Sequence, residues 1–208
     1  MIGELVLTNI IIFITVVISV IALNNHEWFD KLKFNAYDVK HSNQWYRFFT
    51  YGFLHAGYLH LFINMLVFYS FGVIVESYFH IYFPGKAGFY YTLLYIGGLI
   101  LSIIPAFGKN KNDVFYNAVG ASGAVSAVLF SSILLHPTGK IFFFFIPIGI
   151  PAPLFAVLYI AYEYYMSKNA HDNIGHDAHL WGAIYGLLFT IAMKPGLVLI
   201  FLQEIGIG

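Results

Sequence analysis

Ser122 lies in a setting that suits a serine nucleophile. It belongs to the motif Gly120-Ala121-Ser122-Gly123, at the start of an apolar run. A nucleophilic hydroxyl has to be uncrowded, and backbone N–H groups at a helix start can stabilise the oxyanion that forms when a carbonyl is attacked. Most runs of small residues in membrane proteins serve only to let helices pack closely. The motif by itself is therefore only a weak signal of a nucleophile, and a nucleophile would also need a base.

His179 is the candidate base, and two glycines indicate which face of its helix it shares. Gly182 and Gly186 follow it at intervals of three and four residues, so the three positions lie on one face. A helix docked through these glycines would present His179 to its neighbour. If that neighbour is the helix of Ser122, the imidazole can take the proton of the hydroxyl, which is a weak nucleophile without a base. The combination favours catalysis, although a single histidine is more often structural.

A third catalytic member is not evident in the sequence. Asp177 is two residues from His179 and so points to a different face of the helix. The sequence therefore predicts a Ser–His dyad, in which the two residues keep the roles that they have in a triad.

His60 and Asn64 are four residues apart and share a helix face, which Gly72 and Glu76 continue. Polar groups within a membrane are functional or are paired inside the bundle. A polar seam that holds helices together is the alternative for all of them. For Glu76, near the helix end, we favour this structural role.

Composition places these residues in a membrane protein. The 208 residues are 60% hydrophobic and 10% charged, whereas a soluble domain has about 25% charged residues. A soluble fold of this size cannot hide so much apolar surface. The formal net charge is zero, so no nucleic-acid partner is expected. There is no cysteine, which excludes disulfides and thiolate metal sites, and we expect no cofactor.

The apolar runs predict six helices in a single domain, 1–208, separated by turn signals rich in glycine, proline and asparagine. The first run is long enough to cross a bilayer and lacks the basic start and cleavage site of a signal peptide. Pro147 and Pro151 end regular helix, and Pro153 suits a first turn, so the fifth helix is predicted to be short. The expected helices are 2–23, 57–78, 88–107, 119–136, 153–166 and 178–193.

These segments resemble the rhomboid family of intramembrane serine proteases. The resemblance runs from Arg47 to Gly186 and is carried by three separated blocks. These comprise residues 47–50 with 55–64 and 71–76, residues 120–123, and residues 178–186. Each block is modest alone, but their order, with one on every alternate helix, is specific.

The resemblance implies an all-α membrane protein with a six-transmembrane-helix bundle. It implies that Ser122 and His179 form the dyad, and that His60, Asn64 and the Ser122 backbone N–H stabilise the oxyanion. Arg47 would order a first loop that lies partly in the membrane surface. The fifth helix and the loop after it would form a substrate gate. Further supporting positions are Gly120, Gly123, Gly182, Gly186 and Glu76.

Two features depart from the family pattern. Many members have a tyrosine one turn after the nucleophile, packed on the catalytic imidazole, but this chain has Ser126 there. The sequence therefore leaves undecided which side chain holds the ring of His179. The family also implies a cytoplasmic N-terminus, whereas the positive-inside rule places it outside. Most basic residues fall on the side opposite the N-terminus: Lys31, Lys33, Lys40, Arg47, Lys109, Lys111 and Lys168.

The function expected from these observations is intramembrane cleavage of transmembrane segments of other proteins, in the plasma or inner membrane if the source is bacterial. The lipid bilayer and transmembrane substrates are the expected partners. One alternative is a catalytically silent relative that binds transmembrane helices without cutting them. Another is a membrane protein whose histidines bind a metal or haem, although no His-Glu-x-x-His helix is present. Its possible ligands are His55, His60, His176 and His179.

Overall fold

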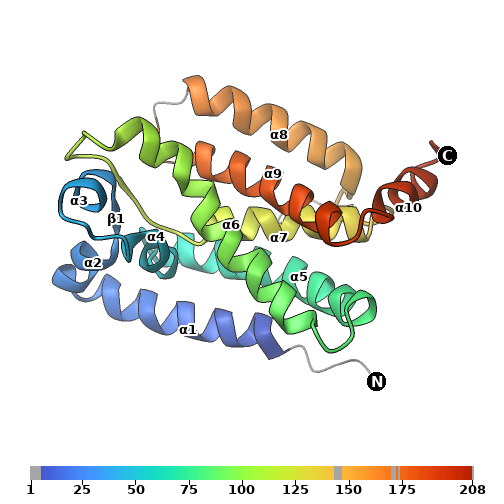
Figure 1. The fold of residues 1–208 in the computed structure, drawn as a ribbon, viewed down its shortest axis with the longest axis horizontal. Coiled ribbons are helices and arrows are strands. Elements are labelled where there is room, and N and C mark those ends of the chain that lie inside the picture. Colours follow the sequence, from blue (N-terminus) through green and yellow to red (C-terminus); the bar gives the residue numbers. More distant parts are fainter. Residues whose placement is uncertain (1–5, 143–146, 170–171, 173, 208) are drawn as a thin grey trace.

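A computed structural model describes residues 6–142, 147–169, 172 and 174–207 of the chain. The described residues are mostly helical (Figure 1). Six helices have fourteen residues or more: α1 (Val6–Leu23), α5 (Tyr58–Tyr82), α6 (Ala87–Asn110), α7 (Ser122–Leu135), α8 (Ala152–Asn169) and α9 (His176–Met193). The shorter ones are α2 (His26–Leu32), α3 (Ala36–His41), α4 (Arg47–Thr50), the 3-10 turn η1 (Tyr51–Phe53) and α10 (Leu197–Glu204).

Three of the described helices, α1, α5 and α6, are long and apolar enough to cross a membrane. The number rises to four if α9 and α10, which meet at a bend of 112°, count as one span. The chain is therefore a predominantly helical membrane protein. Six membrane crossings remain a prediction, because length and composition support fewer.

Helix α7 is the centre of the bundle. Every residue from Gly123 to Leu135 is buried, and α7 contacts α5, α6, α8 and α9. A helix that is apolar on all sides has to be buried among other helices. The residue that begins this helix is consequently placed at a point where several other helices meet.

The described residues include two short antiparallel strand pairs, of which the first connects distant parts of the chain. Strand β1 (Phe34–Asn35) pairs with β2 (Asn117–Ala118), and β3 (Lys140–Ile141) pairs with β4 (Ile150–Pro151). The first pair ties the loop after α1 to the segment that leads into α7. Helix α7 was predicted from residue 119 and instead begins at Ser122. The reason is that residues 117–118 are extended and Gly120 has a φ of +123°.

Other predicted boundaries were also wrong. Helix α8 begins one residue before the predicted start at 153 and ends three residues after the predicted end at 166, so its 18 residues are about 27 Å long. Pro153 is its second residue, where proline is tolerated. Helix α6 continues through Gly108 to Asn110, where the sequence suggested a turn. Helix α9 begins at His176, two residues earlier than expected, and α10 was not predicted.

The loop between α1 and α5 is folded rather than open. Arg47, which is 5% exposed, donates from Nη1 to the carbonyls of Asp30 and Lys33 and from Nε to Gln44 Oε1 at 2.6 Å. Its Nη2 is 3.3 Å from Asp38 Oδ2. One guanidinium thus joins three turns of this loop. The loop elements α2, α3 and α4 gather at one end of the bundle, while both ends of the chain lie at the other (Figure 1).

Glu76 caps the first turn of α1. Its carboxylate accepts from the backbone N–H of Leu7 at 2.8 Å, from that of Thr8 at 3.0 Å and from the Thr8 hydroxyl at 2.6 Å. First-turn amides have no partner within their own helix, so this contact satisfies them inside the bundle. The geometry supports the structural role that the sequence favoured.

Candidate functional site

Ser122 is the first residue of α7. The helical hydrogen bonds begin where the Val125 N–H donates to the Ala121 carbonyl, so the amides just before Val125 lie at the open start of the helix. Within residues 120–135, all of which the structure describes, Ser122 alone is partly exposed and the others are buried. The local fold thus leaves one side chain of this central helix accessible.

The hydroxyl of Ser122 differs from the other hydroxyls of α7. Ser126 Oγ lies 2.9 Å from the Tyr159 hydroxyl, Ser131 Oγ accepts from Thr190, and Ser132 Oγ donates to the Leu129 carbonyl. In the part of the chain that the structure describes, Ser122 Oγ makes no hydrogen bond. Catalytic hydrogen bonds often tighten only when substrate is bound, so an unengaged hydroxyl is compatible with a nucleophile.

Helices α7 and α9 touch through their backbones. A Cβ added to Gly182 would overlap the Gly123 carbonyl, and one added to Gly186 would lie 2.7 Å from Ala127 Cα. A Cβ on Gly123 would lie 3.4 Å from the Ala178 carbonyl oxygen. The neighbour of the glycine face, which the sequence left open, is therefore α7, and the turn of α9 that carries His179 lies against the start of α7.

His60 reaches the same place from α5. Gly120 has a φ of +123°, and a Cβ there would lie 3.4 Å from His60 Nε2 and 3.8 Å from Ser122 Oγ. The imidazole and the hydroxyl thus flank one point that only glycine leaves open. Asn64 is one turn further along α5, is 7% exposed, and donates from Nδ2 to the His60 carbonyl at 3.1 Å.

Glu163 of α8 contacts two histidines of α9, and it was not among the site residues predicted from the sequence. Its Oε1 is 3.1 Å from Nδ1 of His179, and its Oε2 is 2.6 Å from Nδ1 of His176. Its side chain is 6% exposed. An acidic residue within an apolar helix is the signal that could have identified it. Asp177, by contrast, is 2.7 Å from Lys109 on α6, on a different face from His179 as expected.

The contacts continue into the loop between α8 and α9. His176 Nε2 is 3.3 Å from Asp172 Oδ1, and His176 is buried. A hydrogen bond from the Ile174 amide, with a smaller contribution from His176, holds the pKa of the Asp172 carboxyl below its usual range. The contacts that run from His179 through Glu163 and His176 thus end at the anionic carboxylate of Asp172.

The four histidines suggested as metal ligands fall into two pairs. The rings of His55 and His60 are 5.0 Å apart, and His55 Nδ1 is 3.1 Å from Ser19 Oγ. His176 and His179 form the other pair. Among the described residues, the one group of three with ligand atoms within 4.8 Å of one another is Glu163, His176 and His179.

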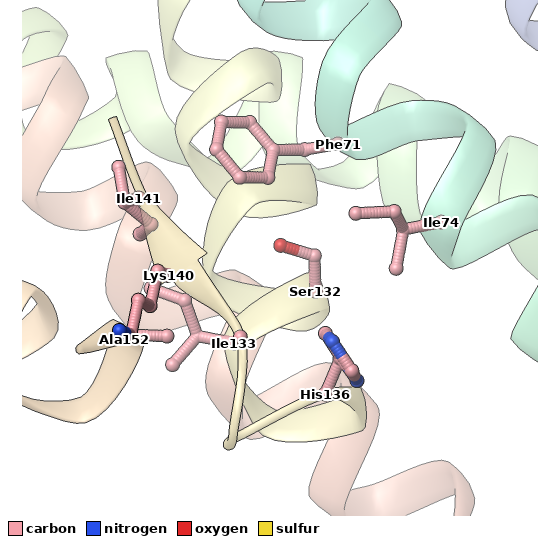
Figure 2. Close-up of a pocket in the computed structure, with 9 residues that line it drawn as sticks. Phe71, Ile74, Ser132, Ile133, His136, Lys140, Ile141 and Ala152 are labelled. Carbon is pink, nitrogen blue, oxygen red and sulfur yellow. The ribbon is translucent and has the colours of Figure 1, made fainter. Parts of the chain in front are cut away.

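A small cavity of about 40 Å³ lies at the opposite end of α7 (Figure 2). The hydroxyl of Ser132 faces it but is engaged with its own helix. Ser132 is ten residues from Ser122, or about 15 Å along the helix axis. This cavity therefore does not belong to the candidate site. Its lining residues are Phe71, Ile74, Ser132, Ile133, His136, Gly139, Lys140, Ile141 and Ala152.

Residues 42–195 match the family described as Rhomboid domain, which is well over half of the chain. The chain belongs to the rhomboid family. It is also 28% identical over 159 residues to the RHOMBOID-like protein 12, mitochondrial, of Arabidopsis thaliana. That alignment covers 71% of this chain and 46% of the relative, so the chain spans less than half the length of the relative. Ser122, His179, His60 and Asn64 all lie inside the matched rhomboid domain, whereas α1 and α10 lie outside it.

Proposed function

We propose that this rhomboid-family chain is an intramembrane serine endopeptidase that cleaves transmembrane segments of other membrane proteins. Ser122 is the nucleophile and His179 the base. The observation that carries the proposal is the backbone contact of Gly182 with Gly123, which brings a hydroxyl without a hydrogen bond next to a histidine-bearing turn. Membership of the rhomboid family supports it.

The reaction starts when His179 takes the proton of Ser122 Oγ and the oxygen attacks a peptide carbonyl. The carbonyl oxygen becomes an oxyanion, which the N–H of Ser122, the His60 ring and the Asn64 amide stabilise. His179 then protonates the leaving amine as the peptide bond breaks and an acyl-enzyme forms. Water, deprotonated by His179, attacks the ester, and the proton returns to Ser122 as the new carboxyl end leaves.

The substrate must expose its backbone to reach this site. A stable transmembrane helix holds each interior carbonyl in a hydrogen bond to the N–H four residues later. Small or helix-breaking residues lower the free energy needed to unwind it. The preferred substrates therefore carry such residues near the scissile bond.

The test is labelling by a serine-directed fluorophosphonate together with cleavage of a helix-destabilised transmembrane substrate. The wild-type protein is expected to be labelled and to cleave. Ser122→Ala and His179→Ala are expected to do neither while remaining folded. Ser132→Ala is the matched control from the same helix, and both signals should persist in it.

Two results would contradict the assignment. Turnover at the wild-type rate by Ser122→Ala would exclude Ser122 as nucleophile. A wild-type protein that binds transmembrane helices but is neither labelled nor active would place this chain among catalytically silent relatives.

A further inference from the structure

Glu163 is one of two buried glutamates among the described residues, and it is held very differently from the other. Glu76 accepts from the start of α1, whereas Glu163 accepts from two imidazoles. A carboxylate removed from water is costly unless hydrogen bonds and an opposite charge compensate for it. Here each oxygen has one ring nitrogen as its partner, and one of these rings belongs to the candidate base.

We propose that Glu163 is a positioning residue for His179, so that the site works as a Ser–His–Glu triad rather than as a dyad. This inference rests on the proposed function. An ionised carboxylate only accepts hydrogen bonds, so the Nδ1 atom 3.1 Å from Glu163 Oε1 must carry the proton. In a neutral imidazole the other nitrogen, Nε2, then has the lone pair that can take the proton of Ser122.

The carboxylate also stabilises the charge that forms on the ring. When His179 accepts the proton of Ser122 it becomes an imidazolium, and an anion at hydrogen-bond distance lowers the free energy of that state. Among the residues that the structure describes, the titratable groups that face His179 are Glu163 on α8, His60 on α5 and His176 on α9. Among these, only Glu163 can carry the negative charge that such a state needs.

Helix α8 holds both helices of the site with one face. Tyr159, one turn before Glu163, lies with its hydroxyl 2.9 Å from Oγ of Ser126, one turn after Ser122. The position where family members often have a tyrosine against the imidazole thus contacts α8 instead. In this chain the contact of Glu163 with Nδ1 orients the ring of His179.

The distances favour hydrogen bonds over a metal ion on the same side chains. Two ligands of a tetrahedral zinc ion lie about 3.4 Å apart, because each is about 2.1 Å from the metal. Glu163 Oε2 and His176 Nδ1 are 2.6 Å apart, which is a hydrogen-bond distance. A bound metal is therefore an outcome to be tested against the proposal.

The central experiment compares Glu163→Gln with Glu76→Gln, the matched replacement of a buried glutamate that caps α1. Glu163→Gln should lower kcat by on the order of 10²–10⁴ with KM changed less than about threefold, because its amide can favour the wrong tautomer. Glu163→Asp, which keeps the carboxylate, should restore part of kcat. Glu76→Gln should lower only the melting temperature.

A second measurement needs no substitution at Glu163. In wild-type protein labelled with ¹⁵N-histidine, the His179 signals, assigned by their loss in His179→Ala, should show that the neutral imidazole carries its proton on Nδ1 and none on Nε2. The opposite tautomer would overturn the proposal even if Glu163→Gln failed to fold.

The remaining outcomes separate this proposal from the one on which it rests. An active wild-type protein whose kcat is unchanged in Glu163→Gln overturns the triad alone. An inactive, unlabelled wild-type protein overturns both. One equivalent of metal in the purified protein, lost in Glu163→Gln, would assign the three side chains to a metal instead.

Discussion

The amide of Asn64 donates one hydrogen bond within its own helix and has a second N–H that is free to donate to a substrate. One of its N–H bonds goes to the His60 carbonyl, and the amide has no other hydrogen-bond partner among the described residues. A side chain buried in a membrane protein usually has all its donors satisfied. The second donor therefore suits an oxyanion that is present only during the reaction.

Asn64→Ala is expected to lower turnover by on the order of 10²–10³ while leaving labelling of Ser122 in place, because nucleophile and base remain. Melting temperature and turnover should be measured on the same sample. Ser70→Ala is the matched control, since Ser70 donates to the Leu66 carbonyl in the same helix. If Asn64→Ala melted earlier yet turned over normally, Asn64 would be structural.

At the residue scale, the sequence predicted those site residues that residue type and local spacing are enough to identify. Ser122 stood out because small residues flank it directly, and His179 because two glycines follow it at helical intervals. Glu163 did not, because its partners His176 and His179 are 13 and 16 residues away across a loop, at no helical spacing. Only the packing of α8 against α9 brings them together.

The close approach of α7 and α9 depends on Gly182 and Gly186, which have no side chain, and not on the candidate site residues. At Gly186 a methyl group would lie 2.7 Å from Ala127 Cα, and backbone cannot move aside as a flexible side chain can. Overpacking of this kind typically costs about 1–3 kcal/mol or more. The helix pair is consequently sensitive to the smallest possible enlargement.

Gly186→Ala is expected to lower the melting temperature and to reduce fluorophosphonate labelling, because α9 can no longer carry His179 to Ser122. Gly108→Ala is the control: nothing lies within 4 Å of a Cβ there, and alanine favours helix by up to about 1 kcal/mol. An unchanged melting temperature and normal labelling in Gly186→Ala would show that the two helices do not pack as described.

At the element scale, apolar runs located the six longer helices but not where they begin and end. The start of α7 depends on the pairing of Asn35 with Asn117, two residues that are far apart in the chain. Such non-local pairing leaves no periodic signal in either segment. Helix α8 was predicted to end at residue 166, where the apolar run stops, but it continues through the polar residues Ser167 and Lys168 to Asn169.

The distribution of charge over the whole molecule bears on its orientation. Three basic residues at the end that holds Ser122 are paired within the protein: Lys33 with Asp30, Arg47 with Asp38 and Lys109 with Asp177. Basic groups engaged in this way are poor reporters of which loops stay in the cytoplasm. The family orientation, with the site facing away from the cytoplasm, therefore remains our prediction.

Helix α6 allows a direct test, because the chain has no cysteine of its own. Lys86 and Lys111 are exposed and bracket its 24 residues, about 36 Å of helix. In intact cells a membrane-impermeant maleimide is expected to label Lys111→Cys, and to label Lys86→Cys only after permeabilisation. The reverse pattern would support the orientation given by the positive-inside rule, and equal labelling of both would mean that α6 does not span.

The cap on α1 has a consequence for the order in which the protein is made. Leu7 and Thr8 precede Glu76 by 69 and 68 residues, so a ribosome adding about 5–20 residues per second completes them roughly 3–14 s earlier. During that interval the two amides depend on water or lipid headgroups, because the hydrocarbon core offers no partner. The first turn of α1 therefore needs another hydrogen-bond partner until Glu76 has been made. The start of α1 is thus translated first, but its amides receive their partner in the bundle only after Glu76 has been translated.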